Sequence, residues 1–92
     1  MENTRRRVQV NQGSIEVAIS VFKECLSERL AEKGYGTFAS SHEILGVITE
    51  EYHELQHAVE ANDKRQVRHE LLDLAVGAIF GVACYDQETC EW

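Results

Sequence analysis

The stretch ILGVITEEYHELQHAVEANDKRQVRHELLD, from Ile44 to Asp73, contains two apolar patterns of helical period, and each carries a cluster of acids. At about 100° per residue, the first pattern forms one stripe on a helical wheel, made of Ile44, Ile48, Leu55 and Val59. Glu51 falls inside that stripe, and Glu54 lies about 60° to one side of Glu51. A carboxylate among apolar side chains is costly to desolvate unless another group compensates it. We therefore expect Glu51 to interact with a compensating group.

The second cluster, Glu70 and Asp73, repeats this arrangement on the next helical pattern. These two acids also lie about 60° apart, beside an apolar stripe made of Val67, Leu71, Leu74, Ala75 and Ala78. Two helices packed along their stripes would bring the acids of both clusters face to face. Like charges gathered in this way repel, and a hard divalent cation such as Mg²⁺, Mn²⁺ or Ca²⁺ is the usual reason to keep them together. The predicted metal ligands are Glu51, Glu54, Glu70 and Asp73.

The sequence before this stretch predicts a further helix, followed by a short loop. Gly13 offers a stop to the preceding segment and Ser14 an N-cap for a first helix, whose apolar pattern is Ile15, Ala18, Ile19, Phe22, Leu26 and Leu30. This helix is expected to end at Gly34. Two aromatic residues of the loop that follows, Tyr35 and Phe38, are expected to plug the end of a helical bundle. Residues 1–12, with the basic run at 5–7, are interpreted as an arm, and residues 13–92 as one helical domain.

The second and third helices have clear start signals. Ser40 and Glu43 form a capping box, so the second helix is expected from about Ser41 to about Ala61. An Asn-Asp pair follows, of which Asp63 is the expected N-cap of the third helix.

The third helix is apolar on nearly all sides between residues 71 and 83. Its second apolar face, turned away from the first stripe, consists of Leu72, Val76, Phe80 and Ala83. A helix that is apolar all round is buried all round, which three helices of one chain cannot achieve. The sequence therefore predicts an all-α bundle of about three helices per chain that is completed by oligomerisation, as a homodimer or homotetramer.

Length and composition exclude several classes of protein. A chain of 92 residues is long enough for one domain, and a core of that size is marginal without a partner. The net charge of −7 argues against a nucleic-acid binder, and no apolar run approaches the length of a membrane span. Three widely spaced cysteines, Cys25, Cys84 and Cys90, do not resemble a disulfide framework, although a pairing of the last two stays open. The expected location is the cytoplasm.

A second metal motif overlaps the first acid cluster. The run His53-Glu54-Leu55-Gln56-His57 matches His-Glu-x-x-His, in which two histidines hold zinc and the glutamate acts as general base. A zinc peptidase is therefore a remote alternative. Both histidines lie about 80° or more from Glu51, on the polar flank, and no further extension of the zinc motif follows.

Three cations, Lys64, Arg65 and Arg68, open the third helix one turn before Glu70. Two interpretations stay open for them, because they can contact phosphate groups of a substrate or simply balance an acidic surface.

The order Glu50-Glu51-x-x-Glu54 followed by Glu70-x-x-Asp73 on successive helices resembles the MazG-like all-α nucleotide pyrophosphohydrolases. The resemblance runs from Phe38 to Val82, about half of the chain. Fuller members of that family continue into a further helix with side chains for the phosphates and the base, and this sequence ends at Trp92.

The resemblance implies an enzyme that uses Mg²⁺, or Mn²⁺, to hydrolyse a nucleoside triphosphate to the monophosphate and pyrophosphate. It implies metal ligands at Glu51, Glu54, Glu70 and Asp73, and catalytic roles for Glu50 and Glu51 in placing a second ion or orienting water. Lys64, Arg65 and Arg68 are then the expected substrate contacts. A non-catalytic helical module of the same fold is the main alternative, and the base and sugar of the substrate stay open.

Overall fold

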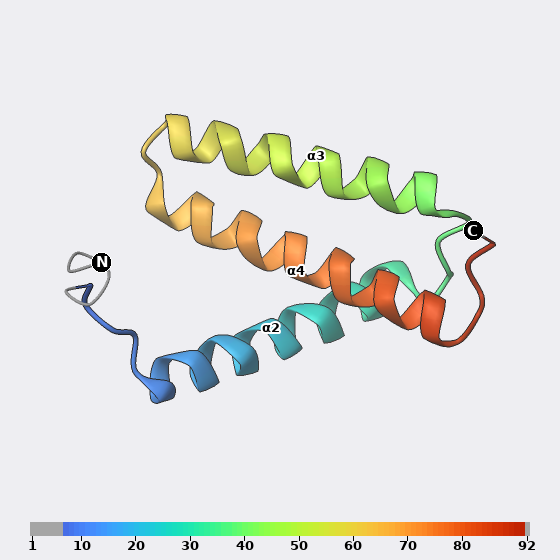
Figure 1. Ribbon diagram of the computed structural model, residues 1–92, viewed down its shortest axis with the longest axis horizontal. Helices are drawn as coiled ribbons and strands as arrows, with labels where there is room; N and C mark the ends of the chain where they lie inside the picture. The colour runs from blue at the N-terminus through green and yellow to red at the C-terminus, as the bar shows by residue number, and fades with distance from the viewer. Residues whose placement is uncertain (1–6, 92) are drawn as a thin grey trace.

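The computed structural model describes residues 7–91, which form three helices and no β-strand. Helix α2 spans Gln12–Lys33, α3 spans Ser41–Glu60 and α4 spans Lys64–Asp86 (Figure 1). The predicted all-α class is confirmed. Residues 1–6, half of the predicted basic arm, lie outside the described residues, and the last arginine of the arm, Arg7, is exposed.

Helix α2 begins slightly earlier than predicted and ends where predicted. Its N-cap is Asn11, whose side-chain oxygen accepts a hydrogen bond of 2.7 Å from the Ser14 backbone N–H. The prediction of Ser14 as the cap was wrong, because the extended backbone of Asn11 places a better acceptor three residues before that N–H. The helix ends at Gly34, which has a φ of 87° and donates its N–H to the Leu30 carbonyl.

The predicted caps of α3 and α4 are confirmed. Ser40 Oγ accepts from the Glu43 N–H at 3.3 Å, and the Glu43 carboxylate accepts from the Ala39 N–H at 2.6 Å. Asp63 accepts from the Gln66 N–H at 3.0 Å and so starts α4 directly after the turn. These local bonds fix α3 and α4 as an antiparallel helical hairpin (Figure 1).

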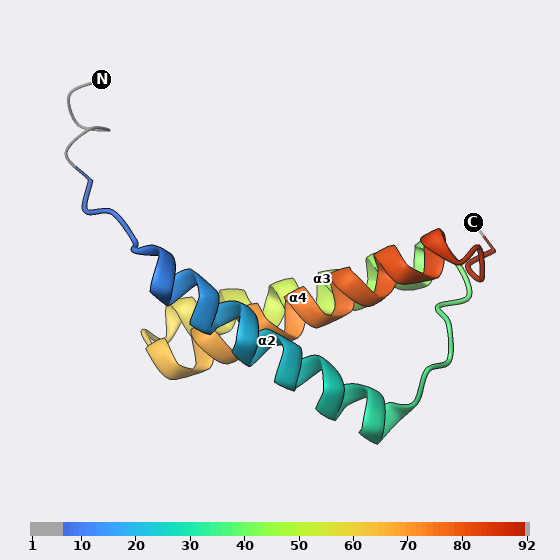
Figure 2. The same cartoon turned by 90° about the horizontal axis from the view of Figure 1, so that it is seen from below.

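Helix α4 lies at the centre of the fold. It packs against α3 along its length and against α2, whereas α2 and α3 do not contact each other within the described residues. Figure 2 shows that α2 crosses α4 and that its C-terminal half diverges from it. The loop from α2 to α3 closes this end, where the Glu91 N–H donates to the Ala39 carbonyl and the Thr37 and Thr89 hydroxyls are 2.7 Å apart.

The buried face of α4 is rotated by about 100° from the predicted stripe. The buried residues of this helix are Glu70, Val76, Gly81 and Cys84. Leu71, placed in the predicted stripe, is 52% exposed, and Val59 of the α3 stripe is also exposed. A Cβ at Gly81 would lie 3.6 Å from Ile44, and one at Gly77 would lie 3.7 Å from Ile48. Both distances are ordinary van der Waals contacts, so Ile44 and Ile48 mark the face of α4 that packs on α3.

Other predicted features can now be placed. Phe38 is half-buried against Phe80, with ring centroids 5.5 Å apart, as expected for a plug, but Tyr35 is exposed, so its part of that prediction was wrong. The three cysteines form no disulfide. Among residues 7–91, no helix combines the length and the apolar character needed to cross a membrane.

Candidate metal centre

Glu51 extends from the middle of α3 into the interface with α4. Its Oε1 atom is buried and has no hydrogen-bond partner among the described residues. The pKa of this carboxyl is raised from 4.5 to about 7. Desolvation by burial is the largest cause, and the nearby charges of Asp73, Glu54 and Glu70 add to it. A carboxyl in this position favours its neutral form unless a cation arrives.

Glu70 is the most deeply buried acid of the described chain, with 6% of its surface exposed. The side chain of Gln66, one turn earlier on α4, donates to Glu70 Oε2. The other oxygen, Oε1, is buried and has no partner among the described residues. Because an unpartnered buried carboxylate oxygen costs free energy, a cation or a hydrogen-bond donor at this position would stabilise the folded chain.

The predicted ligands come together around Glu70. One group consists of Glu51, Glu54 and Glu70, whose ligand atoms all lie within 4.8 Å of one another. A second group, equally close, consists of His69, Glu70 and Asp73. Glu54 and His69 are exposed at the edge, whereas Glu70 belongs to both groups. The structure therefore gathers the four predicted acids at one place on α3 and α4.

These residues fit a hard divalent cation. Carboxylate oxygens are the ligands that Mg²⁺ and Mn²⁺ prefer, and the two unpartnered oxygens of Glu51 and Glu70 supply acceptors that nothing else in the described chain satisfies. The exposed rim at Glu54 leaves access for water and for a substrate. The metal site itself stays a prediction, now with a defined geometry.

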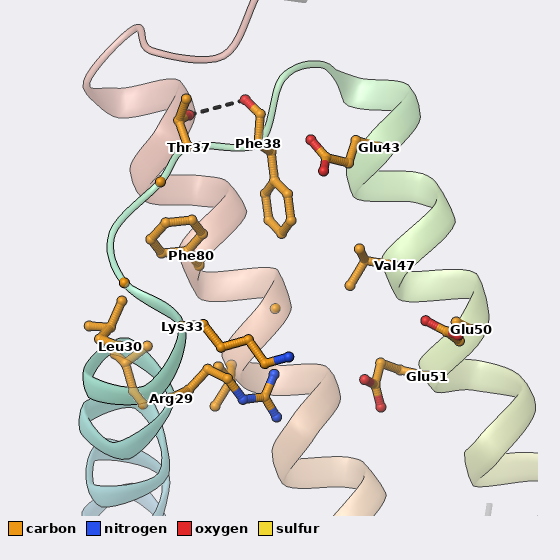
Figure 3. A pocket seen from close by; sticks show the side chains of 15 residues that line it. Arg29, Leu30, Lys33, Thr37, Phe38, Glu43, Val47, Glu50, Glu51 and Phe80 are labelled. Carbon is orange, nitrogen blue, oxygen red and sulfur yellow. Dashed lines mark hydrogen bonds between the residues drawn. The ribbon is translucent and has the colours of Figure 1, made fainter.

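A pocket of about 370 Å³ borders this centre. Its walls come from all three helices and the loop after α2, and Figure 3 shows Arg29 and Lys33 extending from α2 toward Glu51 on α3. Glu50 is exposed and also lines the pocket, next to the acid groups but outside both of them. Phe38 and Phe80 line the end nearer the loop. The pocket thus places Glu51, which is its one lining residue from the acid groups, on the same walls as two cations and two aromatic rings.

Asp73 is the predicted ligand that pairs with basic side chains. Arg29 of α2 lies 3.1 Å from Asp73 Oδ1, and His69 Nε2 lies 3.3 Å from Oδ2. Arg29 was not predicted as a site residue, although its position in the sequence sets it apart. Its wheel position falls within the apolar face of the first helix, between Ala18 and Phe22, as that of Glu51 does on the second.

The other predicted site residues lie away from the pocket. Lys64, Arg65 and Arg68 are exposed on the first turns of α4, and none of them lines the pocket. Their role in substrate binding stays a prediction. His53 and His57 are exposed on α3, and neither belongs to the acid groups around Glu70.

A second hollow, of about 420 Å³, lies between α2 and the C-terminal half of α4. It is lined by Leu26, Leu30, Tyr35, Thr37, Ile79, Phe80, Ala83, Cys84, Gln87 and Thr89. It has neither a carboxylate nor a cation on its walls, so it offers no charged side chain to a hard metal ion or to a phosphate.

Searches with the chain found no matching protein-family model, no matching curated protein and no matching solved structure. The chemistry assigned to the centre is accordingly argued from the residues that form it.

Proposed function

We propose that the protein is a Mg²⁺-dependent nucleoside triphosphate pyrophosphohydrolase of the MazG-like kind. The observation that carries the proposal is the pair of buried, unpartnered oxygens on Glu51 and Glu70. Glu51 also lines a pocket whose walls include the cations Arg29 and Lys33. An acidic centre repels a polyphosphate by itself, so a metal ion is needed for substrate binding as well as for chemistry. Mn²⁺ has the same ligand preference and should replace Mg²⁺.

Five acids take part in this proposal, in two different roles. Glu51, Glu54, Glu70 and Asp73 would hold the divalent cation, which supplies positive charge for the phosphate oxygens and lowers the pKa of a coordinated water. Glu50 lines the pocket but lies outside the acid groups, so its carboxylate is available to orient a water and accept its proton.

The hydrolysis is a single displacement at the α-phosphorus. The water oxygen forms a bond to that phosphorus, and the bond from the phosphorus to the oxygen that bridges the α and β phosphates breaks. Pyrophosphate leaves with the electron pair of that bond. The water proton passes to Glu50 and then to solvent. The products are the nucleoside monophosphate and pyrophosphate.

The proposal includes assembly with further copies of the chain. Three large apolar side chains on the outer face of α4, Leu71, Ile79 and Val82, are 52%, 46% and 54% exposed. They belong to the helix that the sequence predicts to be buried on all sides. A second copy packed on this face would bury them, in a homodimer or a homotetramer.

A nucleotide panel tests the function directly. The protein is incubated with each common ribonucleoside and deoxyribonucleoside triphosphate and Mg²⁺, and pyrophosphate release is measured. Release should occur with at least one nucleotide, stop with EDTA, and return with Mg²⁺ but not with Zn²⁺. Binding of Mg²⁺ or Mn²⁺ without release from any nucleotide would instead support a non-catalytic module. Restoration by Zn²⁺ alone would favour the His53–His57 motif.

A further inference from the structure

Arg29 connects α2 to the acid centre. Its guanidinium lies 3.1 Å from Asp73 Oδ1, its side chain is about one-third exposed, and the same side chain lines the 370 Å³ pocket. Lys33, one turn later on α2, lines the same pocket (Figure 3). One helix therefore brings two positive charges to the place where a metal-bound polyphosphate would lie.

The partner of Arg29 is a residue that a metal ion would also use. A divalent cation bound by Asp73 and Glu70 would compete with the guanidinium for the carboxylate of Asp73 and repel its positive charge. A guanidinium that loses its carboxylate can pair with another anion, and two oxygens of a phosphate group offer the same paired acceptor geometry. The described pocket lies directly within reach, because Arg29 already lines it.

We infer that Arg29 is a phosphate-binding residue that is held by Asp73 until the divalent cation binds, and that it then passes to the phosphates of the substrate together with Lys33. This inference rests on the proposed function and adds α2 to the substrate site. It makes metal binding and phosphate binding mutually supportive, because the cation releases the side chain that the phosphates require.

Two binding measurements on purified full-length protein test this exchange, with inorganic triphosphate as a base-independent probe. The first is a calorimetric titration with Mn²⁺ alone, and the second is binding of triphosphate with Mn²⁺ in excess. Arg29→Gln should bind Mn²⁺ alone several-fold more tightly, because Asp73 loses its competing partner. The same variant should bind triphosphate about tenfold more weakly, because charge-assisted hydrogen bonds are lost. Arg29→Lys keeps the charge without the planar fork and should fall between these values.

Lys23→Gln provides the matched control, because Lys23 is an exposed cation on the same helix that does not line the pocket. It should leave both affinities unchanged. Weaker binding of Mn²⁺ alone by Arg29→Gln would overturn the inference, since Arg29 would then serve only to position Asp73. Unchanged triphosphate binding in both Arg29 variants would also overturn it. Absence of Mn²⁺ binding by the unmodified protein would contradict the proposed function itself. Failure of this inference alone would leave Mn²⁺ binding by the unmodified protein intact, so the two failures are distinguishable.

Discussion

The two sides of α4 are built in opposite ways. The side that faces α3 and α2 buries Glu70, with 6% of its surface exposed, while the outer side leaves Leu71 and Val82 more than half exposed. In a self-sufficient small domain the apolar side chains would be inside and the acid outside. The proposed metal site would account for the buried acid on the inner side, and the proposed assembly would account for the exposed apolar side chains on the outer side. Each kind of surface is costly alone and favourable once its counterpart binds.

The largest expected effect comes from neutralising an acid on the inner side. Glu51→Gln and Glu70→Gln should each reduce pyrophosphate release by at least about 100-fold, because both remove a metal ligand whose loss nothing nearby replaces. The assay is initial-rate pyrophosphate release at saturating Mg²⁺. His53→Ala and His57→Ala are the controls and should retain nearly full release, because both histidines lie on the exposed face of α3. Loss of release in the histidine variants, with retention in the glutamine variants, would support the zinc motif instead.

The next effect concerns the outer side. Val82→Asp should separate the assembly into single chains and reduce its stability by about 2 kcal/mol per chain, the value of burying one aliphatic side chain. Light scattering gives the mass, and chemical denaturation gives the free energy of unfolding. Val8→Asp is the control, because Val8 is 96% exposed and precedes the first helix. A well-folded single chain in the unmodified protein at micromolar concentration would contradict the assignment of this face.

The smallest effect is a pH dependence of the metal-free protein. The pKa of Glu51 is raised from 4.5 to about 7 by desolvation and by Asp73, Glu54 and Glu70, so the folded chain binds more protons than the unfolded chain between these values. The contribution of Glu51 to the free energy of unfolding is therefore fully present below pH 4.5 and is lost as the pH rises through about 7. Chemical denaturation in EDTA at several pH values should show the free energy of unfolding declining over this interval. In Glu51→Gln the decline should be smaller by the contribution of Glu51. If the free energy of unfolding of the unmodified protein instead rose over this interval relative to that of Glu51→Gln, the predicted sign would be contradicted.

Local chemistry could be predicted from the sequence with good accuracy. The capping box at Ser40, the Asp63 cap and the Gly34 stop depend on neighbouring residues only, and the structure confirms all three. Glu51 was identified as special because an acid inside an apolar stripe is visible on a helical wheel. The gathering of the four acids follows from placing such acids on two consecutive helices.

The rotation of α4 could not be predicted in the same way. Because this helix is apolar on nearly all sides, several rotations bury similar areas, and the observed rotation is the one that packs Gly81 against Ile44. That contact joins residues of two different helices and has no local signature. The pairing of Arg29 with Asp73 is likewise a tertiary contact, although the position of Arg29 on an apolar face was a readable sign of it.

The central claim is that the unpartnered oxygens of Glu51 and Glu70 form a divalent cation site. A calorimetric titration of the unmodified protein with Mn²⁺ at neutral pH, repeated on Glu51→Gln, tests it most directly. We predict saturable binding with release of protons, since the raised pKa of Glu51 leaves this carboxyl partly protonated before the ion arrives, and we predict loss of binding in the variant. Equal binding by both proteins, or no binding by either at millimolar Mn²⁺, would contradict the claim.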